Sequence, residues 1–320
     1  MKAVKYTMRG LAKTILHSMP LKRQLFHVFR YFYMLPESVY QHLYFKGPMS
    51  VPVCYGRTFT LYHWGNQVEN DIFWAGLGNN WEATSVRLWL YLARSADTVL
   101  DIGANTGVFA LSAKTVNPDA TVYAFEPIER VHTRLQHNID LNDFSICAVC
   151  VGVSNENGTA TIFDVSAEHV YSASLNREML SDRSDIIERA IEVVRIDTFF
   201  AERDAGGRML VKIDTERHEL QVLEGFGDLI RTLRPTFIVE ILDRIIGQKV
   251  ERFFEGLNYI WLEILEGEGL RPATHLGEAE RNYLLCPREV AEALSVRGMT
   301  HIDLDPRRAG PGGTIRDKVQ

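Results

Sequence analysis

The chain of 320 residues lacks any run of about 18 uncharged apolar residues, so the sequence predicts no transmembrane helix. Its start also lacks the apolar segment of a signal peptide, because His17, Ser18 and Pro20 interrupt that stretch. Cysteine is scarce: the four cysteines show no disulfide framework, and Cys147 and Cys150 have no second pair with which to form a zinc site. We therefore expect a cytoplasmic protein that binds no metal.

Net positive charge is concentrated at the start of the chain. The net charge of residues 1–50 is +7, whereas that of the remaining residues is −13. Basic residues recur there at helical spacing, at Lys2, Lys5, Arg9 and Lys13. A different face of this helix would be apolar, so one interpretation is that residues 1–24 make peripheral contact with an anionic membrane, at the inner membrane surface. The alternative is a helix that packs on the body of the protein or on a partner.

Two apolar runs predict a nucleoside-binding unit. Thr98–Ile102 and Thr121–Phe125 have the composition of strands and flank a segment with helical spacing. The turn after the first run holds Gly103 and Gly107, which let the backbone approach a ligand closely. Glu126 follows the second run, where its carboxylate can accept hydrogen bonds from both hydroxyls of a ribose.

The third glycine of the dinucleotide pattern G-x-G-x-x-G is missing from this turn, which disfavours a nicotinamide cofactor. S-adenosylmethionine fits better, because it has no phosphate to hold. We predict that six residues bind it: Asp101, Gly103, Asn105, Gly107, Glu126 and Asn142.

Four sequence blocks extend the pattern. They begin at Asp101, Ala124, Val211 and Phe237 and read DIGANTG, AFEP, VKIDTERHELQVLEG and FIVEI. In order and spacing the chain resembles the FkbM family of S-adenosylmethionine-dependent methyltransferases over roughly residues 81–287. The resemblance implies an O-methyltransferase that acts on a hydroxyl of a sugar, a glycolipid or another small metabolite. One departure is Arg217, where the family most often has glycine.

The alternation of strands and helices from residue 98 onward predicts an α/β fold, with a Rossmann-like doubly wound sheet of the class I methyltransferase type and an N-terminal helical arm. We expect a basic arm, an aromatic-rich cap, a cofactor-binding domain, and a C-terminal helix with a disordered tail, over residues 1–50, 51–95, 96–290 and 291–320. Helices are expected over residues 106–116, 128–141, 216–231 and 249–256. An excursion over residues 154–191, with a hairpin turn at Asn157 and Gly158, is expected above the carboxyl edge of the sheet.

Methyl transfer to a hydroxyl needs an aligned acceptor and a base that removes its proton. Strand alternation places Lys212 and Asp214 on one face, and Glu216 and His218 begin the next helix. We expect His218 to be the base, since an unperturbed histidine has a pKa near 6.5, with Asp214 or Glu216 orienting or replacing it. Helix capping is the alternative role for Asp214. A charge within an apolar strand is costly unless it is paired, so we also expect Lys212 to pair with Glu240.

Other function classes are carried as alternatives. A catalytically silent module that only binds S-adenosylmethionine is one of them, and Arg217 is the single hint in its favour. A nucleic-acid methyltransferase is less favoured, because the core is acidic and no Asn/Asp-Pro-Pro-Tyr block for a flipped base is present. We expect a small-molecule or glycan acceptor and no nucleic-acid partner.

Overall fold

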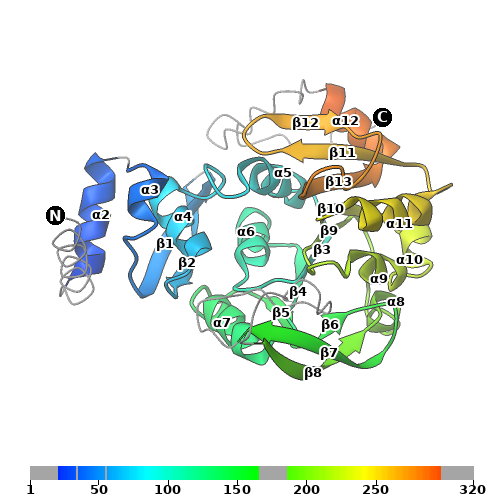
Figure 1. Ribbon diagram of the computed structural model, residues 1–320, viewed down its shortest axis with the longest axis horizontal. Coiled ribbons are helices and arrows are strands. Elements are labelled where there is room, and N and C mark those ends of the chain that lie inside the picture. Colours follow the sequence, from blue (N-terminus) through cyan, green and yellow to red (C-terminus); the bar gives the residue numbers. More distant parts are fainter. Residues whose placement is uncertain (1–20, 34, 55, 166–185, 297–320) are drawn as a thin grey trace, which may run out of the picture.

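An eight-stranded sheet forms the centre of the molecule (Figure 1). The computed structural model describes residues 21–33, 35–54, 56–165 and 186–296. The strand order across the sheet is β12-β11-β13-β10-β9-β3-β4-β5. In chain order these strands are β3 (Thr98–Ile102), β4 (Thr121–Phe125), β5 (Ile146–Val149), β9 (Met209–Ile213), β10 (Thr236–Ile241), β11 (Tyr259–Leu265), β12 (Gly269–Pro272) and β13 (Arg281–Pro287).

The predicted doubly wound sheet is confirmed. Strands β3, β4, β5, β9 and β10 run parallel, and β13 is antiparallel to both β10 and β11. From β3 the chain builds outward through β4 and β5, and then returns to place β9 on the other side of β3. The loops that follow β3 and β9 therefore leave the sheet at a switch point, where open α/β sheets form a crevice at the carboxyl ends of their strands.

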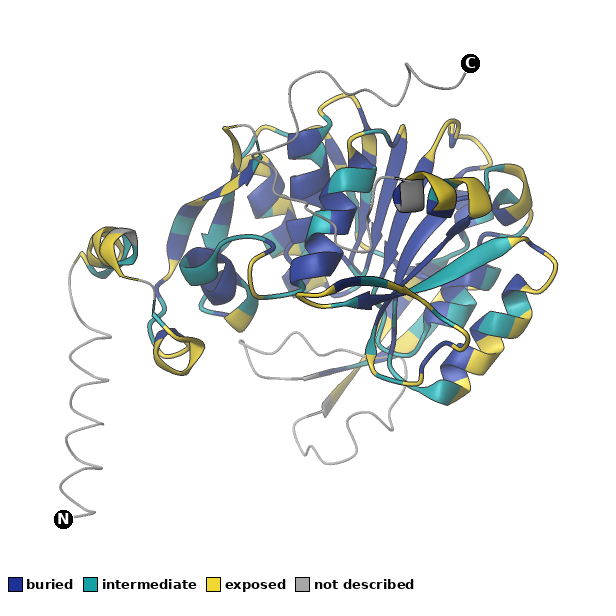
Figure 2. Ribbon diagram, turned by 90° about the horizontal axis from the view of Figure 1, so that it is seen from above, coloured by how far each residue is buried: buried dark blue, intermediate teal, exposed yellow. Residues whose placement is uncertain are grey.

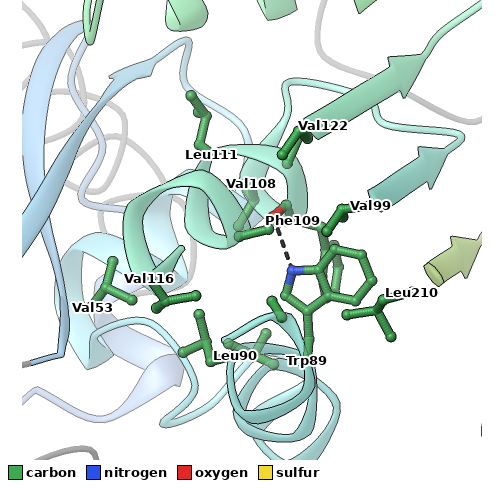
Figure 3. Close-up of a cluster of buried hydrophobic side chains, with 14 of the residues drawn as sticks. Val53, Trp89, Leu90, Val99, Val108, Phe109, Leu111, Val116, Val122 and Leu210 are labelled. Carbon is green, nitrogen blue, oxygen red and sulfur yellow. Dashed lines mark hydrogen bonds between the residues drawn. The ribbon is translucent and has the colours of Figure 1, made fainter. Parts of the chain in front are cut away.

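Helices cover both faces of the sheet. Alternate residues of each strand point to opposite faces, so both faces offer apolar side chains on which helices can pack. Val99 packs in a cluster with Trp89, whereas its neighbour Leu100 packs in a second cluster with Phe237. Figure 3 shows Trp89 among Val99, Val122 and Leu210, with its indole N–H donating to the carbonyl oxygen of Phe109 at 3.0 Å. The helices are α5 (Ala83–Ala93), α6 (Val108–Val116), α7 (Glu129–Asp140), α8 (Ile196–Phe199), α9 (Glu219–Glu224), α10 (Leu229–Thr232), α11 (Arg244–Phe254) and α12 (Arg288–Val296).

The N-terminal part lies at one end of the molecule (Figure 1). It consists of α2 (Lys22–Phe32), α3 (Glu37–Tyr40), the antiparallel pair β1 (Gly47–Cys54) and β2 (Arg57–His63), and α4 (Gln67–Ala75). Side chains from α7 and the turn after it hold β2 in place: Asn138 accepts from the N–H of Tyr62, and Asn142 bonds both backbone groups of Thr60. The hairpin is thereby tied to the sheet domain.

A second, three-stranded sheet corrects one prediction. Its strands are β6 (Gly152–Val153), β7 (Gly158–Val165) and β8 (Ile186–Val194), in the order β6-β8-β7. The turn at Asn157 and Gly158 connects β6 to β7, but β8 lies between those two strands. The predicted hairpin is therefore wrong, because the two residues of β6 pair in parallel with β8 and leave β7 to pair on the opposite edge of β8.

The single helix predicted over residues 216–231 is also wrong, since α9 and α10 are separate short helices. Glu216 and Arg217 have φ angles of +54° and +75°, which exclude them from a helix, and Gly227 at φ +51° separates α9 from α10. The predicted helix over most of residues 1–24 and the predicted disordered tail lie outside the described residues. No helix in the described ranges is long and apolar enough to cross a bilayer.

Candidate active site

A pocket of about 190 Å³ lies at the carboxyl ends of β3, β4 and β9. Three of the six predicted cofactor-binding residues line it, namely Gly103, Asn105 and Glu126, and so do all three predicted catalytic residues, Asp214, Glu216 and His218. The excursion after β5 contributes a wall through Gly152 and Ile191, among others. The switch point of the sheet therefore brings together residues that lie far apart in the sequence.

Glu126 is buried at the end of β4 and organises the loop after β3. One carboxylate oxygen accepts from the N–H of Asn105 at 3.1 Å, and the other accepts from the N–H of Ile128 at 2.9 Å. Burial raises the pKa of Glu126 to about 7. Because a carboxylate oxygen has two lone pairs, each oxygen keeps one with which to accept from a ligand in the pocket.

The two glycines of the loop are required by packing inside the protein. A Cβ on Gly103 would lie 1.9 Å from the carbonyl oxygen of Asp214, and a Cβ on Gly107 would lie 2.5 Å from a methyl group of Leu135. Both glycines also have positive φ angles, +82° and +90°. Gly103 still borders the pocket, whereas Gly107 does not line it and begins α6.

Two further predicted cofactor residues do not line the pocket. The carboxylate of Asp101 accepts from the N–H of Ala110 at 2.9 Å and so caps the third residue of α6. Asn142 uses its amide on Thr60 and on the carbonyl of Asn138. The acidic residue at the end of β3 thus holds the helix, and Asn142 joins the sheet domain to β2.

The loop after β9 carries the three predicted catalytic side chains. His218 is the N-cap residue of α9, and its Nε2 lies 3.0 Å from the hydroxyl oxygen of Ser154. Burial lowers the pKa of His218 to about 4, so its ring is neutral at neutral pH. Burial, together with the nearby carboxylates of Asp214 and Glu280, raises the pKa of Glu216 to about 7.

Lys212 lies within the sheet, 1% exposed, under these carboxylates. Its ammonium contacts Asp214 Oδ2 at 3.3 Å and Asn282 Oδ1 at 3.2 Å, and no direct contact to Glu240 is present. The predicted Lys212–Glu240 pair is therefore corrected to a pair with Asp214. Burial and the carboxylate of Asp214 raise the pKa of Glu240 well above its usual range, which favours the protonated form of Glu240.

Several lining residues escape sequence reasoning. Val68 and Glu69 reach the pocket from α4. Trp81 belongs to the aromatic-rich cap that the sequence predicts and also lines the pocket, whereas Trp64, Phe73 and Trp74 do not. Ser154, the partner of His218, comes from the excursion, 64 residues away in sequence. No spacing rule connects such distant positions.

Arg217 adopts the left-handed conformation that favours glycine, at φ +75°. Its Nε lies 3.4 Å from Asp243 Oδ2, and the side chain does not line the pocket. The side chain of Arg217 therefore contributes nothing to the walls of the pocket.

Comparison with known proteins identifies the family. Residues 101–267, more than half of the chain, match the model of the methyltransferase FkbM domain. The chain belongs to this family. Its cofactor is accordingly S-adenosylmethionine, and its fold is that of the class I methyltransferases.

The individual relatives of this chain have low sequence identity to it. The hexuronic acid methyltransferase AglP of Haloferax volcanii is 29% identical over 50% of this chain and 62% of its own length. The 31-O-demethyl-FK506 methyltransferase FkbM of Streptomyces tacrolimicus is 31% identical over 42% and 61%. The chain thus spans about three fifths of the length of these curated relatives. Among solved structures, a methyltransferase FkbM from Methylobacillus flagellatus is 14% identical, with a TM-score of 0.39 over 68% of this chain and 55% of that one.

The chemistry of the pocket fits this cofactor. Glu69, Glu126, Asp214 and Glu216 line it, and Arg130, the one lysine or arginine among the described lining residues, is paired with the buried carboxylate of Asp164 at 2.6 Å. An acidic lining suits a ligand with a sulfonium and an ammonium group and disfavours a pyrophosphate. The carboxylate of Asp101 also accepts a hydrogen bond from a backbone N–H in the first turn of α6, which is where a dinucleotide phosphate would bind.

Proposed function

We propose that this FkbM-domain protein transfers the methyl group of S-adenosylmethionine to a hydroxyl of a neutral sugar, glycolipid or other polyhydroxylated small molecule. The observation that carries the proposal is the pocket itself, which combines the cofactor loop after β3 with an acidic, half-buried loop after β9. When bound, S-adenosylmethionine supplies an electrophilic methyl group. The protein then has to hold the acceptor in line and remove its proton.

The carboxylates favour a neutral acceptor. An acidic acceptor would bring its own negative charge beside Asp214 and Glu216, and the one arginine among the described lining residues already pairs with Asp164. Placing like charges close together in a half-buried site is costly. AglP of Haloferax volcanii is named for hexuronic acid and the Streptomyces relative for 31-O-demethyl-FK506. The acidic lining of the pocket therefore supports an uncharged acceptor that is methylated on a hydroxyl, and not an acceptor that carries a carboxylate.

We infer that Glu216, which lines the pocket at the turn after β9, is the base. Its pKa of about 7 lies near the pH at which an enzyme works, which is where a general base is most effective. His218 is neutral at neutral pH, but its pKa of about 4 makes it a weak base. Asp214 is engaged by Lys212, whose ammonium lies 3.3 Å from Asp214 Oδ2. We therefore assign proton removal to Glu216 Oε, with His218 and Ser154 holding the loop.

The structure also suggests how the acceptor is held. Trp81 comes from the turn before α5 and lies against Phe109, with ring centroids 5.7 Å apart, and both rings line the pocket. The apolar face of a sugar ring or of another flat acceptor can pack on such a wall while its hydroxyls face the carboxylates. Trp81 thereby becomes the proposed acceptor platform.

The experiment is a transfer assay with methyl-labelled S-adenosylmethionine and three acceptor classes: a neutral sugar, a hexuronic acid and an amino sugar. We expect label in the neutral sugar, in a product that resists mild alkali, because an ether is stable where a methyl ester is hydrolysed. Alkali-labile label in the hexuronic acid, or label on the amine nitrogen alone, would overturn the hydroxyl assignment.

A further inference from the structure

Helix α2 has an apolar face that points away from the protein. Leu25, Val28, Phe29 and Phe32 are spaced i, i+3, i+4, i+7 and therefore share one face. Their exposed fractions are 48%, 60%, 43% and 69%. Figures 1 and 2 both place α2 at the edge of the molecule, with its outer side coloured as exposed in Figure 2. A stripe of this spacing normally faces a core, but here it faces outward.

The opposite face of α2 already attaches the helix to the protein. The ring of Phe26 lies 5.4 Å from that of Trp74, and the ring of His27 lies 5.0 Å from that of Phe73. The guanidinium of Arg30 donates to the carbonyl oxygen of Phe73 and covers its ring. The apolar stripe is therefore not the face by which α2 packs on the described part of the chain.

Charge distinguishes the occupants that could cover this stripe. Residues 1–50 carry +7, and within α2 and its surroundings Lys22, Arg23 and Lys46 are basic, whereas Glu37 is the single acidic residue of those fifty. If a second copy of the chain docked on the stripe through the same region, two segments that each carry a net charge of +7 would repel one another. An anionic lipid surface would be attracted instead, at a strength that grows with each basic residue near the headgroups.

We propose that α2 lies on an anionic bilayer, with Leu25, Val28, Phe29 and Phe32 inserted at the boundary between headgroups and acyl chains. A helix with a large apolar face and basic surroundings binds in this way, without spanning the membrane. The surface is separate from the pocket, so the proposal stands independently of the methyl-transfer reaction. It places the enzyme beside membrane-borne acceptors and leaves the cofactor pocket in the body of the protein.

The test is co-sedimentation of the full chain with vesicles at low salt, using phosphatidylglycerol mixed with phosphatidylcholine and, separately, phosphatidylcholine alone. Val28→Glu/Phe32→Glu is the variant, and Ile245→Glu is the control, because Ile245 is equally exposed at 69% but lies on α11. We expect the double variant to bind anionic vesicles at least about tenfold more weakly than the wild type. The control variant should bind as the wild type does, and all three should keep the same melting temperature and cofactor affinity.

Each other outcome overturns the proposal in a defined way. Wild-type protein that stays in the supernatant with anionic vesicles at low salt excludes a lipid-binding role for α2. Equal binding to neutral and anionic vesicles removes the charge argument. Concentration-dependent dimerisation that Val28→Glu/Phe32→Glu abolishes, without vesicle binding, assigns the stripe to a second copy of the chain.

Discussion

Gly103 and Asp214 touch across the switch point of the sheet: a Cβ on residue 103 would lie 1.9 Å from the carbonyl oxygen of Asp214. The N–H of Asp214 in turn donates to the carbonyl of Ile102 at 3.0 Å. The cofactor loop after β3 and the catalytic loop after β9 are thus fixed to each other through their backbones. A change on one loop must move the other.

Gly103→Ala is expected to lower stability by more than the about 1 to 3 kcal/mol that a strained φ alone costs, because the added methyl group also displaces the backbone of Asp214. Gly256→Ala is the matched control, since Gly256 has φ +75° and open space around its Cβ position. Denaturant unfolding measures both. Equal losses in the two variants would show that strain alone, and not the contact with Asp214, makes Gly103 necessary.

Arg217→Gly should relieve the strain of a left-handed arginine and leave the protein as stable as the wild type or up to about 1 kcal/mol more stable. Arg217→Ala keeps the strained φ and loses the contact with Asp243, so it should be the least stable of the three. Thermal unfolding ranks them. A glycine variant less stable than the alanine variant would contradict the strain argument.

Glu216→Gln is expected to lower the turnover rate about 10²- to 10⁴-fold, because a general base acts on the proton of the acceptor. Its affinity for S-adenosylmethionine should change little, since the amide keeps the shape of the side chain. His218→Asn is the comparison and should lose less than about tenfold. Should the histidine variant be the inactive one, the base is His218 and burial has not weakened it.

Cofactor affinity should rise with pH through about 7. The pocket carboxyls of Glu69 and Glu126 each have a pKa raised to about 7 by burial, so they are neutral below that pH and negative above it. The cofactor carries a net positive charge and binds the charged form better, which means that binding releases protons. Titration calorimetry at about pH 6 and about pH 8 tests the sign. An affinity that falls with pH would show that these carboxyls do not face the cofactor.

The central strands were predictable because they are buried on both faces. Thr98–Ile102 and Thr121–Phe125 are short apolar runs in the sequence, and the observed bounds of β3 and β4 agree with those runs. Each run is followed directly by a glycine or an acidic residue that the structure places near the switch point. A motif whose residues are close together in the sequence can therefore be predicted from the sequence alone.

The remaining features depend on interactions that the spacing of apolar residues does not reveal. The carboxylate of Glu219 accepts from the N–H of Arg217 and from the hydroxyl of Thr215, which folds residues 215–217 into a turn where helical spacing predicts a helix. The place of β8 between β6 and β7 likewise depends on a strand that begins at residue 186. Local side-chain hydrogen bonds in the first case, and strand pairing between distant segments in the second, override the structure that the sequence pattern predicts.

The most direct test of the account is a calorimetric titration of the protein with S-adenosylmethionine and with NAD, repeated for Glu126→Ala. Glu126 organises the cofactor loop and keeps lone pairs toward the pocket. We expect the wild type to bind S-adenosylmethionine and not NAD, and the variant, still folded, to bind about 1.5 to 3 kcal/mol more weakly. Binding of NAD by the wild type, or unchanged affinity for S-adenosylmethionine in the folded variant, would contradict the assignment of this pocket as the cofactor site.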